Sequence, residues 1–179
     1  GTHKHPITFE GYPGEEAIIT GADLVEGWAA GVDGVFFAPF ESELEDQNQL
    51  FCDGAMLTEA CWPHPGEDPL FHPKRAVATE GSANTLTCDA LPGDKDSWKG
   101  AQLWCAGGQG WICWNSPVTD YDDTTHTITI EDHKPKFYPP RKGSLFSLRG
   151  VRSALQHPGQ WFYDASEKKL YLIPPPKGH

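Results

Sequence analysis

Three tryptophans fall within eleven residues of the segment GAQLWCAGGQGWICWNSP, residues 100–117. An indole ring can stack on the apolar face of a sugar ring, and amides or carboxylates beside it can hydrogen-bond the sugar hydroxyls. We expect at least one ring of Trp104, Trp111 and Trp114 to be exposed; the alternative is that all three fill a core between two sheets. The candidate ligand-binding residues of this segment and its surroundings are Trp98, Trp104, Trp111, Trp114, Gln102, Gln109, Asn115 and Asp96, followed by Trp62 and Tyr121.

The acidic residues are the second group whose side chains could catalyse a reaction or bind a metal. Glycoside hydrolysis needs two carboxyl groups on either side of a sugar, roughly 5–10 Å apart, and no spacing here places two of them on one strand face. Glu59, in the motif TEACWP, is the single catalytic candidate, and its alternative role is that of a hydrogen-bonded structural residue. Asp120, Asp122 and Asp123 offer hard oxygens for calcium on one turn, without the Gly-spaced loop or bidentate Glu that completes a calcium site. We expect no organic cofactor and no other metal.

The charge of the chain limits its partners. Its 179 residues contain 14 Lys and Arg and 25 Asp and Glu, a formal net charge of −11. Such a chain repels nucleic-acid phosphates and anionic membrane surfaces, whereas an uncharged glycan meets no such repulsion. No run of about 18 apolar residues is present to span a membrane. The sequence starts GTHKHPITFEGYPG, without an initiator Met or a signal peptide, so we expect a mature or excised segment of a longer protein.

The elements that must position these groups have the pattern of short strands joined by turns. In residues 100–117, two apolar runs flank a Gly-rich break at 106–110, which predicts a β-hairpin with a five-residue loop. Alternation then places Gln102 and Trp104 on one strand face and Leu103 and Cys105 on the other. No helical period is sustained over ten residues, so the prediction is an all-β fold, a β-sandwich or barrel-like domain. Further strands are expected at 7–12, 17–21, 34–40, 50–52, 55–57, 84–91, 125–130, 145–148, 161–163 and 170–173.

The cysteines show no CxxC pair, and their odd number argues against a complete disulfide framework. Cys105 and Cys113 lie on opposite arms of the predicted hairpin, so a cross-strand bridge between them is one alternative. Buried free thiols are the other, because a free cysteine packs as a small apolar side chain. The five cysteines are Cys52, Cys61, Cys88, Cys105 and Cys113.

Three segments carry a resemblance to a known family: PITFEGYPGEEAIITGAD (6–23), QLFCDGAMLTEACWPHP (49–65) and SALQHPGQWFYDASEKKLYLIPP (153–175). They resemble the N-terminal portion of secreted right-handed parallel β-helix proteins that act on or bind polysaccharides, in which an inserted β-sandwich or barrel-like domain interrupts the opening coil. Cys61 stands where that family has a basic residue, and Gln160 stands where it has a Glu. The resemblance implies an opening β-helix-like coil at residues 1–24 and the inserted domain at residues 25–179.

The same resemblance bears on function. Catalytic carboxylates in that family sit on β-helix coils after the LYLIPP segment, and this chain has no repeating 20–25-residue ladder to build such coils. It therefore implies a non-catalytic carbohydrate-binding domain of an extracellular protein that degrades plant polysaccharide, with xylan as ligand and the rest of a longer β-helix protein as partner. The alternatives are a fragment of a β-helix glycoside hydrolase or polysaccharide lyase, and a structural insertion that caps the β-helix.

Overall fold

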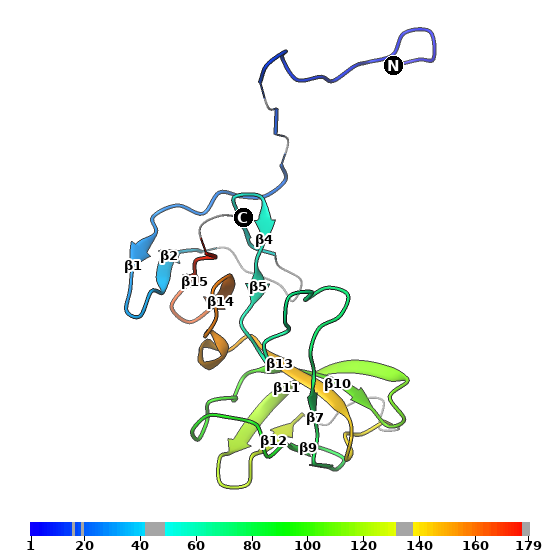
Figure 1. The fold of residues 1–179 in the computed structure, drawn as a ribbon, viewed down its shortest axis with the longest axis vertical. Helices are drawn as coiled ribbons and strands as arrows, with labels where there is room; N and C mark the ends of the chain where they lie inside the picture. Colours follow the sequence, from blue (N-terminus) through cyan, green and yellow to red (C-terminus); the bar gives the residue numbers. More distant parts are fainter. Residues whose placement is uncertain (16, 19, 42–48, 132–137, 177–179) are drawn as a thin grey trace.

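The computed structural model describes residues 1–15, 17–18, 20–41, 49–131 and 138–176, and their regular structure is almost entirely β (Figure 1). A five-stranded sheet, here the small sheet, has the order β1 (Ala29–Ala30), β2 (Phe36–Pro39), β15 (Lys169–Ile173), β14 (Gln160–Asp164) and β5 (Thr58–Glu59). An eight-stranded sheet, here the large sheet, has the order β6 (Cys61–Trp62), β13 (Leu145–Arg149), β10 (Gln102–Gly107), β11 (Ile112–Asp122), β12 (Thr127–Ile130), β9 (Thr85–Thr87) and β8 (Glu80–Gly81), with β7 (Ala76–Val77) paired to β13. A separate hairpin consists of β3 (Phe51–Cys52) and β4 (Ala55–Met56), and η1 (Arg152–Ala154) is a short 3-10 turn.

These sheets confirm the predicted all-β class. Their arrangement is consistent with a β-sandwich, and no closed barrel forms within the described residues. Every strand pair in that part of the chain is antiparallel except β5 with β14, so the stacked parallel coils of a β-helix are not seen there. Nor does that part contain a helix of the length and apolar character needed to cross a bilayer.

The central hairpin forms from β10 and β11, as predicted. Strand β10 continues through part of the Gly-rich break, so the connection is residues 108–111 rather than five residues. Leu103 and Cys105 are fully buried, whereas Gln102 and Trp104 are half-buried on the opposite face, as the alternation of a strand requires. One face of the hairpin therefore packs into the core, and the opposite face is partly open to solvent.

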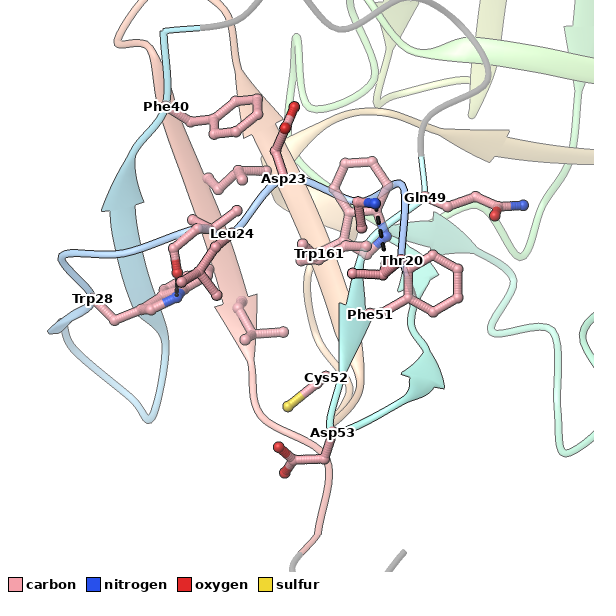
Figure 2. Close-up of a pocket in the computed structure, with 15 residues that line it drawn as sticks. Thr20, Asp23, Leu24, Trp28, Phe40, Gln49, Phe51, Cys52, Asp53 and Trp161 are labelled. Atoms are coloured by element: carbon pink, nitrogen blue, oxygen red, sulfur yellow. Dashed lines mark hydrogen bonds between the residues drawn. The ribbon is translucent and has the colours of Figure 1, made fainter. Parts of the chain in front are cut away.

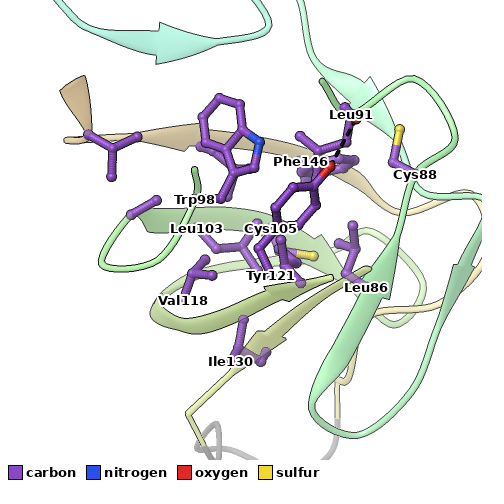
Figure 3. Packing of buried hydrophobic residues seen from close by; sticks show 14 of the residues in the cluster. Leu86, Cys88, Leu91, Trp98, Leu103, Cys105, Val118, Tyr121, Ile130 and Phe146 are labelled. Carbon is purple, nitrogen blue, oxygen red and sulfur yellow. Dashed lines mark hydrogen bonds between the residues drawn. The ribbon is translucent and has the colours of Figure 1, made fainter. Parts of the chain in front are cut away.

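The main core lies against the buried face of the large sheet (Figure 3). Trp98, Tyr121 and Phe146 are its largest fully buried side chains, and aliphatic residues of β9 to β13 fill the space between them. Burying a side chain such as Phe146 stabilises a fold by about 1.5–3 kcal/mol. A second, smaller cluster packs on the small sheet and contains Leu57, Trp161, Leu170 and Leu172.

Residues 58–62 join the two sheets. The chain pairs with β14 of the small sheet as β5 and, after Ala60, pairs with β13 of the large sheet as β6. Ala60 is held on both sides, because its N–H donates to the Trp161 carbonyl (2.7 Å) and its carbonyl accepts from the Gly150 N–H (3.1 Å). The two sheets are thus tied together by backbone hydrogen bonds, which fixes Glu59 of β5 beside the end of β13.

The N-terminal residues differ from the prediction. The strands expected at 7–12 and 17–21 are not formed in the described residues, and this segment extends away from both sheets (Figure 1). Ile7, Phe9 and Tyr12 are exposed. A strand gains stability by pairing with a neighbour, and no described strand pairs with this segment, which explains the wrong prediction. The domain boundary after residue 24 stays a prediction.

Candidate functional site

One face of the large sheet carries three of the predicted binding residues, Gln102, Trp104 and Asn115. The side chains of β10, β11 and β13 that point away from the core form a surface that we term the outer face: Gln102, Trp104, Cys113, Asn115, Ser147 and Arg149. The strand register sets Trp104 between Asn115 of β11 and Ser147 of β13. Residues directly opposite in an antiparallel pair have Cβ atoms about 4.5–5.5 Å apart, so these three form one row across the sheet.

Arg75 covers one side of the Trp104 ring. Its guanidinium carbon lies 4.5 Å from the ring centroid, which is cation–π distance. Arg75 directly precedes β7, the strand that pairs with β13, and this position brings it over the outer face. Partial burial lowers the pKa of the Arg75 guanidinium from its ordinary value, although an arginine stays protonated at neutral pH. Trp104 therefore presents a ring that is shared with a cation.

Glu59 and Arg149 lie at the β6 side of the outer face. The Glu59 Oε2 is 3.6 Å from the Arg149 Nη1, and the register places Arg149 between Gln102 and Cys61. Burial and the Glu59 charge raise the pKa of the Cys61 thiol to about 11, while Arg75 and Arg149 oppose that shift. These groups therefore lie within one another's electrostatic reach. Glu59 acts as the counter-ion of Arg149, and its catalytic role stays a prediction.

The hairpin loop extends the outer face at the start of β11. Trp111, in this loop, is 82% exposed, which confirms the expectation that at least one of the three neighbouring rings is open to solvent. Gln109 lies in the same loop, where its Oε1 accepts a hydrogen bond of 3.0 Å from the Arg141 Nη2. The loop thus combines an open aromatic ring with a polar side chain that is held in place.

Three of the predicted stacking residues are core residues instead. Trp98, Trp114 and Tyr121 are at most 8% exposed, and a ring with no open face cannot stack on a ligand (Figure 3 shows Trp98 and Tyr121). These rings can be buried at low cost because each indole N–H or hydroxyl donates a hydrogen bond to a backbone carbonyl. The hydrogen bonds run from Trp98 Nε1 to the Pro92 carbonyl (2.6 Å), from Trp114 Nε1 to the Tyr138 carbonyl (3.0 Å) and from the Tyr121 hydroxyl to the Leu91 carbonyl (3.1 Å).

Two further candidates lie away from the outer face. Trp62 is half-buried, with its ring centroid 6.2 Å from that of Trp98 and 5.8 Å from that of Phe146. It therefore packs against the core. Asp96 is exposed in the loop that precedes β10 and has a φ of 68°. The structure brings neither residue to the row formed by Trp104 and its neighbours.

Two of the predicted calcium ligands, Asp120 and Asp122, lie at the end of β11, and Asp123 lies in the turn that follows. One carboxylate oxygen of Asp122 accepts hydrogen bonds from the Thr124 N–H (2.9 Å) and hydroxyl (2.6 Å), and these bonds lower the pKa of Asp122. Asp120 and Asp123 are the other candidates. Among the described residues, no three His, Cys, Asp or Glu side chains are grouped to hold a metal ion. Calcium binding therefore rests on the sequence pattern alone.

The cysteines are all free thiols. Cys105 lies opposite Trp114, and Cys113 lies opposite Ala106, so the two thiols are on opposite faces of the hairpin. The alternative of a cross-strand bridge between them is therefore excluded. Cys88 and Cys105 are buried, as the alternative predicted. Cys113 is exposed on the outer face, which corrects that prediction for this residue.

A separate cleft of about 560 Å³ lies beside the small sheet (Figure 2). Aromatic rings of Trp28, Phe40, Phe51 and Trp161 line it, with Asp23 and Asp53 among its polar residues. Trp161 Nε1 is buried and lacks a hydrogen-bond partner within the described part of the chain. Sequence reasoning missed this cleft because its walls come from separate segments of the chain. The one available signal was Phe51 beside the Asp53–Gly54 turn.

Comparisons with known proteins bear on the fold. No protein-family model and no curated protein sequence matches the chain. A solved structure described as "Glycoside hydrolase" matches it with a TM-score of 0.61 at 16% sequence identity. The likeness is one of fold. It covers 87% of this chain and 28% of that chain, so the described architecture corresponds to under a third of a larger protein.

Proposed function

We propose that the chain is a non-catalytic carbohydrate-binding domain of an extracellular, polysaccharide-degrading protein, and that it holds its ligand on the outer face and the adjoining loop 108–111. The observation that carries this proposal is the exposure of Trp111, 82% open to water at the edge of a face that also holds Gln102, Trp104 and Asn115. The fold shared with part of a solved glycoside hydrolase supports it.

Binding follows from the chemistry of these side chains. A pyranose ring stacks its apolar face on Trp111, and a second sugar unit contacts the exposed part of Trp104. Gln102, Asn115 and Ser147 then hydrogen-bond sugar hydroxyls across the strands. A bound polysaccharide keeps an attached catalytic domain near its substrate by raising the effective concentration. Xylan is the first ligand to test, since the family resemblance implies a plant hemicellulose.

Affinity electrophoresis of the 179-residue chain in gels that contain soluble xylan tests the proposal. We expect retardation of the wild type and a loss of about tenfold in affinity in Trp111→Ala, since losing a stacking contact of about 1.4 kcal/mol changes a binding constant tenfold. Phe9→Ala is the matched control, because Phe9 is a similarly exposed ring, 87% open to water, in the N-terminal segment that belongs to neither sheet.

Two results would contradict the proposal. The first is a wild-type chain that no polysaccharide in a panel of neutral and acidic glycans retards. The second is equal retardation of wild type and Trp111→Ala. Release of reducing sugar that disappears in Glu59→Gln would instead establish the enzyme alternative.

A further inference from the structure

Arg75 holds donor groups that the described chain does not use. None of the described ion pairs joins Arg75 to a carboxylate, and its hydrogen bond in the described residues, to the Lys74 carbonyl, is 3.5 Å long. The guanidinium lies over the Trp104 ring, and a stacked guanidinium keeps the N–H groups along its edge available. A partly buried cation with open donors is suited to an anionic partner.

We propose that the ligand of the outer face is a largely neutral polysaccharide that carries single uronate groups, and that Arg75 binds a uronate carboxylate. This inference rests on the proposed function and names its substrate class. A carboxylate matches the planar fork of an arginine and accepts two parallel N–H bonds from it. The sugar ring of the same unit can then lie against Trp104, so that charge and stacking act on one residue of the glycan.

The charges around the outer face favour a carboxylate at this place. Arg75 and Arg149 contribute two positive charges there, and Glu59 contributes one negative charge that is already paired with Arg149 at 3.6 Å. Asp120 and Asp122 lie further along β11, beyond Pro117, where that strand pairs with β12. The side of the sheet formed by β10 and β13 is therefore cationic in a chain whose net charge is −11.

The net charge also limits the density of anionic groups on the ligand. A polymer with a charge on every sugar unit meets the repulsion of the whole chain along its length. A neutral backbone with sparse carboxylates meets little of it, because charges further apart than about 8 Å are largely screened at 0.15 M salt. The weaker repulsion of the sparsely charged polymer favours a hemicellulose with uronate side groups over a polyuronate as ligand.

Binding of glucuronoxylan and of the same polymer after carboxyl reduction tests the inference. Reduction turns each carboxylate into a hydroxymethyl group and leaves the backbone unchanged. With the full chain at 0.15 M NaCl and isothermal titration as readout, we expect the acidic form to bind about tenfold more tightly, the effect of one charge-assisted contact. Arg75→Gln should remove this preference, and Arg75→Lys should keep part of it because it retains the charge without the fork.

Lys95→Gln is the matched control, since it removes one charge from an exposed loop off the outer face. Equal binding of both polymers by the wild type would overturn the inference and leave the proposed function in place. Equal weakening of both polymers by Arg75→Gln and Arg75→Lys would also overturn it, because Arg75 would then only support Trp104. Failure of both polymers, and of every neutral glycan, to bind would end the proposed function as well.

Discussion

Trp98 and Trp111 lie on either side of strand β10 in the sequence, and they differ in burial: Trp98 is in the core and Trp111 is exposed to solvent. The indole N–H of Trp98 donates to the Pro92 carbonyl at 2.6 Å, and its ring is 2% exposed. Trp111 is in the hairpin loop with most of its ring in water. An acceptor for the N–H stabilises a buried indole, and the Pro92 carbonyl provides one for Trp98. Residue type alone therefore does not separate a core ring from an exposed ring.

The two tryptophans should respond differently to truncation. We expect Trp98→Ala to lower the free energy of unfolding by about 3–5 kcal/mol, because it leaves a large cavity and an unused carbonyl. Trp111→Ala should change it by less than about 0.5 kcal/mol, as for most exposed sites. Urea denaturation followed by far-ultraviolet circular dichroism measures both values, and similar losses in the two variants would contradict this assignment of core and surface.

At the scale of elements, the turn between β14 and β15 depends on one carboxylate. Asp164 accepts hydrogen bonds from the Ser166 N–H (2.9 Å), the Ser166 hydroxyl (2.6 Å) and the Glu167 N–H (3.1 Å). The Ser166 hydroxyl is the main cause that lowers the pKa of Asp164 below its ordinary 3.8. The charged form is therefore the one that holds the turn.

The lowered pKa of Asp164 makes its contribution to the free energy of unfolding depend on pH. A lowered carboxyl pKa stabilises the fold above the unfolded-state value near 3.8, and the contribution is lost as the pH falls through the lower folded-state pKa. We expect Asp164→Ala to cost about 1 kcal/mol or less at pH 7, because the group is partly open to screening water, and to cost less at pH 3. Thermal unfolding at both pH values measures this, with Asp94→Ala, an exposed loop aspartate, as control; a difference that grows toward pH 3 would refute it.

The elements that could be predicted from sequence are those with local signals. The hairpin of β10 and β11, the Asp53–Gly54 turn between β3 and β4, and the pair β14 and β15 all follow from alternation and turn residues. The segment 7–12 has the same alternation and forms no strand in the described chain. Alternation shows that a segment suits a sheet, whereas pairing depends on a partner elsewhere in the chain.

The candidate site was predictable only in part for the same reason. Gln102, Trp104 and Asn115 were found because they share one hairpin. Arg75 was missed because it comes from a proline-rich stretch and reaches Trp104 only through the pairing of β7 with β13. Burial of Trp114 was hidden as well, since its acceptor belongs to Tyr138, 24 residues away along the chain.

At the scale of the whole molecule, stability resides in the two sheets and their clusters rather than in the N-terminal residues. Ile7, Phe9, Tyr12 and Ile18 are all at least 67% exposed, so they bury little apolar area. Removal of residues 1–19 should therefore shift the thermal midpoint by less than about 2 °C, below the effect of 1 kcal/mol in a domain of this size.

Differential scanning calorimetry of the full chain and of residues 20–179 measures that shift. The variant Leu170→Ala is the control for a real loss of packing, since Leu170 belongs to the small-sheet cluster and is 2% exposed. If truncation lowered the thermal midpoint as much as Leu170→Ala does, the N-terminal residues would be shown to contribute to the core.

Of the five free cysteines, Cys113 is the one that is exposed, so it is the preferred site for a covalent label. Burial raises the pKa of Cys105 to about 12 and that of Cys61 to about 11, and burial together with the Asp53 charge raises the pKa of the half-buried Cys52. A raised pKa holds these three sulfurs in the less reactive thiol form near neutral pH, and Cys88 is buried. A maleimide dye will therefore couple first at β11, two residues from Trp111. Such a fluorophore would lie near Trp111, where the glycan of the proposed function would change its emission on binding, so Cys113 would serve as the attachment point of an optical sensor.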